Sequence, residues 1–209
     1  MNLWKYYDGD LKYPDLTKHS HVKEVAKVTP RWAYEYAKKH GKDEELESII
    51  AKNTEYSYLY AKHIKGHFKL GEPAIAKSAE YSYGYSEWVL HGPFPLGEKA
   101  IAASSYYSFV YAKLLKRRFE LGEPTIAKSA EYSYEYTNEV LDSRFELGEP
   151  AIAKNAYYSF YYALKVLNGP FPLGEPAIAK DAYYSQAYTN EVLKKDFYLD
   201  GKLIRKYKG

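Results

Sequence analysis

The side chains in this sequence that could do chemistry begin with the histidines, because imidazole is a common metal ligand. His63 and His67 are four residues apart, a spacing that places two ligands on one face of a helix. Gly66 lies between them, however, and is predicted to end that helix. His19 and His21 are two residues apart and would point to opposite sides of a helix. The histidines therefore predict neither a metal site nor a cofactor site.

Hydroxyl side chains recur in the motif Tyr-Ser-Tyr, and the chain has 26 tyrosines. A serine or tyrosine nucleophile needs an adjacent base, and we predict that no histidine or acid acts as that base. Glutamates do recur, but each opens a short predicted helix, where a carboxylate suits the positive end of the helix dipole. These helix-start residues are Glu72, Glu98, Glu123, Glu149 and Glu175. We therefore predict that the protein is not an enzyme.

The densest group of positive charge consists of Lys113, Lys116, Arg117 and Arg118. Such a cluster can contact nucleic-acid phosphates, and tyrosine rings can stack on bases. It can equally be the solvated end of a helix. The formal net charge of the chain is only +3, from 30 basic and 27 acidic residues, which argues against a dedicated polyanion binder. Nucleic-acid binding is therefore the second hypothesis.

A further candidate site lies on the face of the long predicted helices that should point to solvent. The residues there vary from repeat to repeat, and several are aliphatic or aromatic where polar residues are expected. Exposed clusters of this kind mark partner surfaces, and Trp and Tyr dominate binding hot spots. The predicted partner-binding residues are Leu59, Trp88, Tyr106, Val110, Leu114, Tyr157, Tyr161 and Tyr183. The alternative is that the short helices or self-association cover them.

These residues stand in a repeated sequence whose most regular marker is an isoleucine. It recurs every 25 or 26 residues, at Ile50, Ile75, Ile101, Ile126, Ile152 and Ile178. A period of this size predicts a stacked array of helical repeats. Each unit is expected to hold a short helix and then a longer one, for example Ala79–Leu90. The long helices are predicted to begin at strong N-cap residues, namely Asn53, Ser78, Ser104, Ser129, Asn155 and Asp181.

A loop with a phenylalanine returns the chain to the next short helix, and the extra residue of the 26-residue units is predicted to lie just before it. Within the long helices, two tyrosine columns are expected to fill the seams between units, with hydroxyls reaching an edge or a backbone carbonyl. The serine between them is expected to let helices approach closely. The second column consists of Tyr60, Tyr85, Tyr111, Tyr136, Tyr162 and Tyr188.

The predicted fold class is all-α, an α-solenoid of about seven helical-hairpin repeats with caps at both ends. The predicted divisions are an N-terminal cap at residues 1–24, one repeat array at 25–197, and a C-terminal cap with a basic tail at 198–209. Within the last segment, residues 201–207 are expected to form the short helix of an incomplete further unit.

The composition also excludes several classes of protein. There is no cysteine, so a disulfide framework, a thiolate zinc site and a cysteine nucleophile are ruled out. The first residues lack the apolar segment of a signal peptide, and no run approaches the ~18 apolar residues of a membrane span. The sequence therefore favours a cytoplasmic protein without a membrane partner.

The repeat phrase Leu-Gly-Glu-Pro-x-Ile-Ala-Lys-Ser-Ala-Glu-Tyr-Ser-Tyr-x-Tyr is complete at Leu70–Tyr85 and at Leu121–Tyr136. It resembles short tyrosine-rich helical repeats in proteins of tailed bacteriophages and some bacteria, over about residues 44–197. The resemblance carries no catalytic residues. It implies a phage-encoded protein that acts in the host bacterial cytoplasm, with a host or anti-phage defence protein as its partner. The leading hypothesis is therefore a non-enzymatic protein-binding scaffold.

Overall fold

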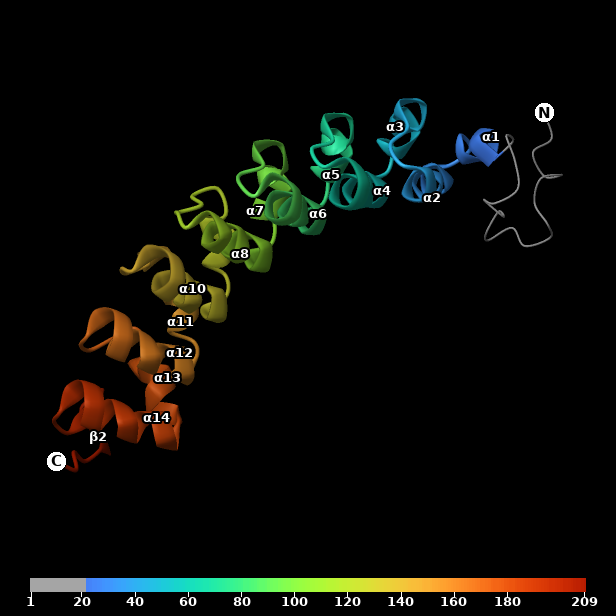
Figure 1. Cartoon of the computed structure of the whole chain (residues 1–209). Coiled ribbons are helices and arrows are strands. Elements are labelled where there is room, and N and C mark those ends of the chain that lie inside the picture. The colour runs from blue at the N-terminus through green and yellow to red at the C-terminus, as the bar shows by residue number, and fades with distance from the viewer. Residues whose placement is uncertain (1–21) are drawn as a thin grey trace, which may run out of the picture. The chain divides into compact units, whose positions relative to one another are not determined.

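The computed structural model describes residues 22–209 and is mostly helical, with a small two-stranded sheet (Figure 1). The predicted all-α class is confirmed at this level. The chain divides into two compact units, Met1–Ile101 and Ala102–Gly209, and each is described by itself. The N-terminal cap predicted at residues 1–24 lies outside the described residues, except for residues 22–24.

The first unit alternates short and long helices. Its short helices are α1 (Val22–Ala26), α3 (Glu44–Ile50), α5 (Glu72–Ile75) and α7 (Glu98–Ala102), whose last residue lies beyond the unit boundary. Its long helices are α2 (Pro30–His40), α4 (Thr54–Tyr60) continued by η2 (Ala61–Lys65), and α6 (Ala79–Tyr85) continued by η4 (Ser86–Leu90). The 3-10 turns η3 (Lys69–Gly71) and η5 (Pro95–Gly97) lead into α5 and α7. Successive long helices contact one another, α2 with α4 and α4 with α6.

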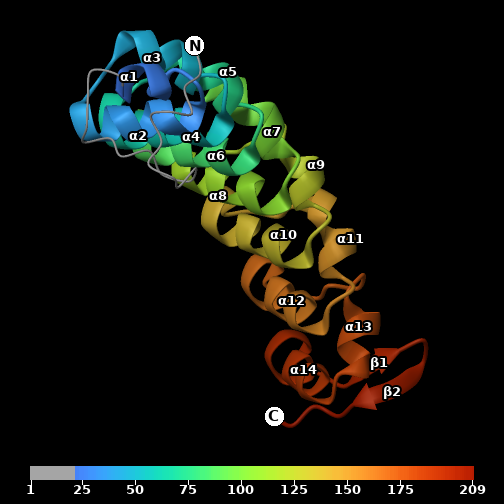
Figure 2. The ribbon, with the colours of Figure 1, turned by 90° about the vertical axis from the view of Figure 1, so that its right-hand side faces the viewer.

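The second unit repeats this order. Its short helices are α9 (Glu123–Ile126), α11 (Glu149–Ile152), which follows the 3-10 turn η7 (Glu146–Gly148), and α13 (Glu175–Lys180). Its long helices are α8 (Ser105–Leu115), α10 (Ala130–Tyr136) with η6 (Thr137–Leu141), α12 (Ala156–Tyr161) with η8 (Tyr162–Leu167), and α14 (Ala182–Ala187) with η9 (Tyr188–Leu193). The long helices α10, α12 and α14 follow one another, with α11 and α13 beside them (Figure 2).

Every predicted N-cap is confirmed. The side chains of Asn53, Ser78, Ser104, Ser129, Asn155 and Asp181 each accept a hydrogen bond from a backbone N–H in the first turn of a long helix. Such a bond satisfies one of the donors that a helix start leaves without a partner. The cap residues therefore determine where each long helix begins.

The last turn of most long helices is π-helical, which the sequence did not indicate. The segments η2, η4, η6, η8 and η9 are π-helical, whereas α8 stays α-helical to its end. A π turn holds one more residue than an α turn. Residues 66–67 follow η2 and residues 91–93 follow η4, so here the extra residue lies before the phenylalanine, as predicted. The link after α8, residues 116–118, is as long as the link after η4, although this repeat has only 25 residues. Its long helix is one residue shorter instead, because it lacks the π turn, so for this repeat the prediction is wrong.

The glycine of each Leu-Gly-Glu turn is required by space rather than by backbone conformation. The φ angle of Gly148 is −87°, which any residue can adopt. A Cβ atom at Gly148 would lie 2.6 Å from the ring of Phe145 and 2.6 Å from the side chain of Ser133. Ser133 is fully buried and donates its hydroxyl to the carbonyl oxygen of Ile126 at 3.1 Å. The serine therefore permits a close approach, but of the turn glycine rather than of another helix, as was predicted.

The second tyrosine column forms buried hydrogen-bond chains. The backbone N–H of Phe145 donates to the hydroxyl of Tyr162 at 3.3 Å, and this hydroxyl donates to Glu149 Oε1 at 2.8 Å. The guanidinium of Arg144 donates to the other oxygen of the same carboxylate at 2.9 Å. Each chain thus ties together the loop, the short helix and the long helix that follows it.

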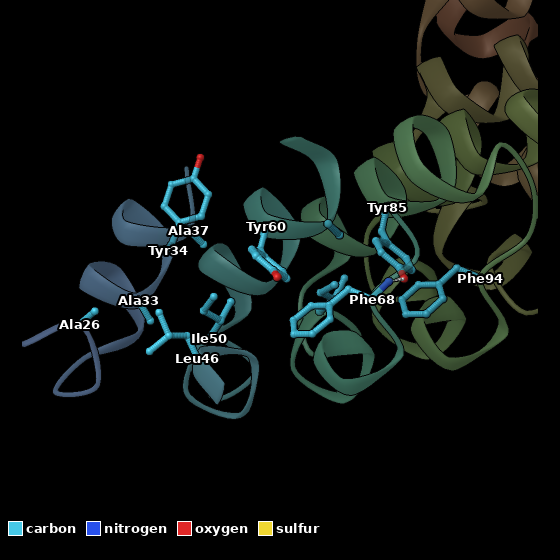
Figure 3. Close-up of a cluster of buried hydrophobic side chains, with 12 residues drawn as sticks. Ala26, Ala33, Tyr34, Ala37, Leu46, Ile50, Tyr60, Phe68, Tyr85 and Phe94 are labelled. Carbon is cyan, nitrogen blue, oxygen red and sulfur yellow. Dashed lines mark hydrogen bonds between the residues drawn. The ribbon is translucent and has the colours of Figure 1, made fainter. Parts of the chain in front are cut away.

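This arrangement recurs along the chain. Figure 3 shows the first of these bonds in the first unit, where the backbone N–H of Phe68 donates to Tyr85 at 3.0 Å. Tyrosine–glutamate pairs are Tyr60–Glu47, Tyr85–Glu72, Tyr136–Glu123, Tyr162–Glu149 and Tyr188–Glu175. The prediction for the hydroxyls of this column is therefore wrong, because they donate to carboxylates rather than to an edge or a carbonyl. The prediction that the glutamates open the short helices is confirmed, and the carboxylates in these pairs in addition bind the long helix that follows.

Because the tyrosines of this column are buried, we predict that the chain loses its helical structure cooperatively at alkaline pH. Burial raises the pKa of Tyr136 to about 12, and burial also raises the pKa of Tyr60, Tyr85, Tyr162 and Tyr188. Above the ordinary pKa of about 10 the unfolded chain loses protons that the folded chain keeps. Their contribution to the free energy of unfolding is therefore complete below pH ~10 and is lost as pH rises through ~12. Far-UV circular dichroism and tyrosinate absorbance should change in one transition. Full ionisation of the tyrosines with helicity retained would contradict this.

The C-terminal segment is not the short helix that was predicted at residues 201–207. It is an antiparallel hairpin of β1 (Phe197–Leu199) and β2 (Lys202–Arg205). The turn residues Asp200 and Gly201 both have positive φ, 50° and 76°. Asp-Gly between two apolar segments is a strong local signal for such a turn. The seven-residue spacing from Phe197 to Ile204 obscured that signal, although Phe197 does fill the buried phenylalanine position.

Candidate binding surface

Each long helix presents an outward row of residues two, six and ten positions after its N-cap. Residues four apart lie one above the other on a helix face. In the second unit the rows are Tyr106, Val110 and Leu114 on α8; Glu131, Glu135 and Glu139 on α10 and η6; Tyr157, Tyr161 and Lys165 on α12 and η8; and Tyr183, Ala187 and Glu191 on α14 and η9. The row of α10 and η6 is therefore entirely acidic, whereas the rows of the adjacent helices α8 and α12 are mostly aromatic or aliphatic.

The eight predicted partner-binding residues fall into two classes. Trp88, Tyr106, Tyr157 and Tyr183 are exposed, at 56%, 48%, 43% and 70%. Leu59, Val110, Leu114 and Tyr161 are half-buried. Gly84 explains why the sixth position is less open, since a Cβ atom there would lie 2.9 Å from the hydroxyl of Tyr58 on the preceding long helix. That position faces the neighbouring helix, whereas the second position faces solvent.

The rings of α12 and α14 form a continuous tyrosine surface, in which Tyr157 and Tyr183 are exposed and Tyr158, Tyr161 and Tyr184 are half-buried. The ring centroids of Tyr157 and Tyr161 are 4.7 Å apart, and those of Tyr157 and Tyr184 are 5.8 Å apart. Tyr183 lies 5.1 Å from Tyr184, at an interplanar angle of 85°. Edge contacts of this kind are favourable and hold the rings in place. A partner would therefore meet a prearranged aromatic surface.

The glutamate row of α10 and η6 consists of Glu131, Glu135 and Glu139. Glu139 forms an ion pair with Lys113. Burial raises the pKa of Glu135, and the nearby carboxylates of Glu139 and Glu131 raise it further. Three carboxylates in one row repel one another. The row is therefore a site of concentrated negative charge on this face.

The glutamate row borders the tyrosine surface. The pKa of Tyr158 is raised by burial and then by the charges of Glu131, Tyr157 and Glu135, which are all close to it. The ring of Tyr158 also lies 5.8 Å from that of Tyr134 on α10. Negative charge and aromatic rings therefore share one part of the second unit.

In the first unit the exposed indole of Trp88 already has a cation above it. Lys62 Nζ lies 4.7 Å from the ring centroid of Trp88 and 5.6 Å from that of Tyr58. A lysine over an aromatic face is attracted by the negative charge of the π system. Trp88 is therefore available to a partner only on the part that Lys62 leaves open.

In the basic cluster predicted for nucleic-acid contact, two of the four side chains are bound by carboxylates. Lys113 pairs with Glu139, and Arg118 donates two hydrogen bonds of 2.8 Å to the carboxylate of Glu123. Lys116 is the left-handed residue that ends α8, with φ 50°, and Arg117 is exposed next to it. Two of the four positive charges are thus already partnered by carboxylates.

The histidines of the first unit do not converge. His67 lies 2.6 Å from a carboxylate oxygen of Glu72, in the hydrogen-bond chain of Tyr85, whereas His63 is exposed on η2. Across residues 22–209 there is no group of three or more His, Cys, Asp or Glu side chains placed to hold a metal ion. The buried serines donate to backbone carbonyls, as Ser133 does, and this binding explains their recurrence.

Sequence reasoning missed a second apolar row, the leucine of each Leu-Gly-Glu turn. Leu70 and Leu96 in the first unit are both 54% exposed. Their counterparts in the second unit, Leu121, Leu147 and Leu173, are between 53% and 57% exposed. A residue that recurs in every repeat need not be buried, and these leucines are an example. The adjacent glycine packs against the buried phenylalanine and serine, and the leucine before it stays exposed to solvent.

Comparison with known proteins adds no relative: no family model, curated protein or solved structure matches the chain. In the part of the chain from residue 22 onward, none of the helices has the length and apolar character needed to cross a bilayer.

Proposed function

We propose that this protein is a non-enzymatic scaffold that binds a protein partner on the outward face of its long helices. The observation that carries the proposal is the exposure of Tyr106, Tyr157 and Tyr183 on the long helices of the second unit; in the first unit Trp88 is exposed on a long helix as well. Exposed aromatic clusters of this kind are typical of interaction sites, and Tyr and Trp supply much of the binding energy at interfaces. The tyrosine surface is the centre of the proposed site.

The proposal includes a finer architecture, an α-solenoid of about seven hairpins in which each unit is stabilised by its neighbours. The repeated tyrosine–glutamate links support it. A cytoplasmic location and a phage-encoded inhibitor of a host or defence protein are the specific form of the proposal, and they rest on the resemblance of the repeats to phage proteins. Self-association through the same face is an alternative use of it.

Nucleic-acid binding is the weaker alternative. The glutamates of the outward row repel phosphate, and Lys113 and Arg118 are engaged by carboxylates. A nucleic-acid site would be expected to present its positive charges together along the backbone path. The exposed tyrosines favour a protein partner more than these paired charges favour a nucleic acid.

The test is affinity capture from bacterial lysate with the wild-type chain and with two variants. Tyr157→Ala/Tyr183→Ala removes the exposed rings of the proposed site. Tyr198→Ala is the matched control, because this tyrosine is 54% exposed but lies on the C-terminal hairpin. We expect a protein that is retained at high salt by the wild type and the control and lost by the double variant. Recovery of nucleic acid alone, with a steep loss as salt rises, would contradict the proposal.

A further inference from the structure

The chemistry around the tyrosine surface indicates what kind of partner fits it, an inference that rests on the function proposed above. We propose that this surface docks a basic segment of the partner protein, whose lysine or arginine side chains lie over the rings of Tyr157 and Tyr161 and against the carboxylates of Glu131 and Glu135. The partner is thus defined by positive charge presented along an exposed stretch of chain.

Charge complementarity is the first argument. In the described part of the chain, residues 22–209, no lysine, arginine or histidine forms an ion pair with Glu131 or Glu135, whereas Glu139 is paired with Lys113. Glu135 is half-buried between its two neighbours in the row, so its charge is only partly solvated. A cation from a partner relieves the repulsion within the row and gains attraction from both carboxylates.

The chain's own lysines provide the second argument, because they already bind in this way. Lys113 Nζ pairs with Glu139 and lies 5.8 Å from the ring centroid of Phe109. In the first unit, Lys62 lies over Trp88 at 4.7 Å. Each case places a cation over an aromatic ring on a long helix. Arginine suits such a site especially well, since its planar guanidinium stacks on rings and pairs with carboxylates.

Other occupants satisfy the surface less well. An apolar helix laid across it would bury the carboxylates of Glu131 and Glu135 without a partner, which costs free energy. A nucleic acid would bring its phosphates against the same carboxylates, although bases could stack on the rings. A basic segment is the occupant that uses both the rings and the charges.

The experiment titrates the full chain with a fluorescent peptide of alternating arginine and glycine, followed by anisotropy. The same peptide with citrulline in place of arginine serves as the neutral probe. We expect the arginine peptide to bind and the citrulline peptide not to bind. Glu131→Gln/Glu135→Gln and Tyr157→Leu/Tyr161→Leu should each weaken binding about tenfold. The control Glu44→Gln/Glu120→Gln removes the same amount of charge from exposed positions off the outward face and should have little effect. Circular dichroism melting checks that each variant is folded.

Three results would overturn the inference. One is an equal loss of affinity in both glutamate variants, which would indicate general charge attraction. Another is unchanged binding in the folded tyrosine variant. The third is no binding of the arginine peptide to the wild type. If that third result accompanied a captured protein that Tyr157→Ala/Tyr183→Ala releases, the proposed function would stand and the partner's chemistry would be different.

Discussion

The Tyr162→Phe variant is expected to lower the free energy of unfolding by about 1–3 kcal/mol, although it removes only one oxygen atom. Tyr162 is fully buried, and its hydroxyl accepts from the backbone N–H of Phe145 and donates to Glu149. Without the hydroxyl, the N–H has no acceptor and the carboxylate loses a donor in a site that water does not reach. Urea unfolding followed by circular dichroism gives the difference directly.

Tyr161→Phe is the matched control for this change. Tyr161 is adjacent in sequence and half-buried, and within residues 22–209 its hydroxyl makes no hydrogen bond. Its replacement should change the free energy of unfolding by less than about 0.5 kcal/mol. Similar losses in both variants would contradict the assigned role of the Tyr162 hydroxyl, because the loss would then come from the ring environment in general.

Gly148→Ala is expected to destabilise the chain by about 1–3 kcal/mol, as overpacking of a buried contact does. The added methyl group would lie 2.6 Å from both the ring of Phe145 and the side chain of Ser133. Phe145 and Ser133 are both buried, so relief requires the turn and the long helix to move apart. Thermal or urea denaturation measures the loss.

Gly169→Ala supplies the comparison, because it adds the same methyl group in open space. The nearest atom to that methyl group would be the carbonyl oxygen of Leu167, at 3.8 Å. Stability should stay the same or rise by up to about 1 kcal/mol, since alanine restricts the unfolded chain. If Gly148→Ala were equally harmless, the close approach of the turn to Ser133 could not be the reason for the recurring glycine.

Much of the local structure could be predicted from the sequence. The caps at Ser129 and Asn155 were predictable because an N-cap depends on residues within one helical turn. The buried serines and the exposed tyrosines at positions 106, 157 and 183 followed from helical periodicity. The hairpin at Asp200 and Gly201 was also readable locally, and it was missed because a longer-range spacing was given more weight.

The candidate site was predicted only in part. The outward row was identified, but four of its eight predicted residues proved half-buried. Three of them, Leu59, Val110 and Tyr161, occupy the sixth position of a long helix, which faces the neighbouring helix, and the fourth is Leu114 at a tenth position. The exposed leucines were missed, since recurrence in a sequence does not distinguish a buried residue from one next to a buried residue. The sequence does not show that the glutamate row lies beside the tyrosine surface, because this depends on the packing of α12 against α10.

By itself, the sequence determined the helical segments, the starting points of the long helices and the outward tyrosines at positions 106, 157 and 183, because these depend on contacts within a few residues. The tertiary structure decided which groups the buried hydroxyls bind. Tyr162 reaches Glu149 and Phe145, which lie 13 and 17 residues away along the chain, and their positions depend on how the loop and two helices pack. It also decided that the turn glycines are needed for space and that the glutamate row lies beside the tyrosine surface. Such partners come from different elements, so no local pattern specifies them.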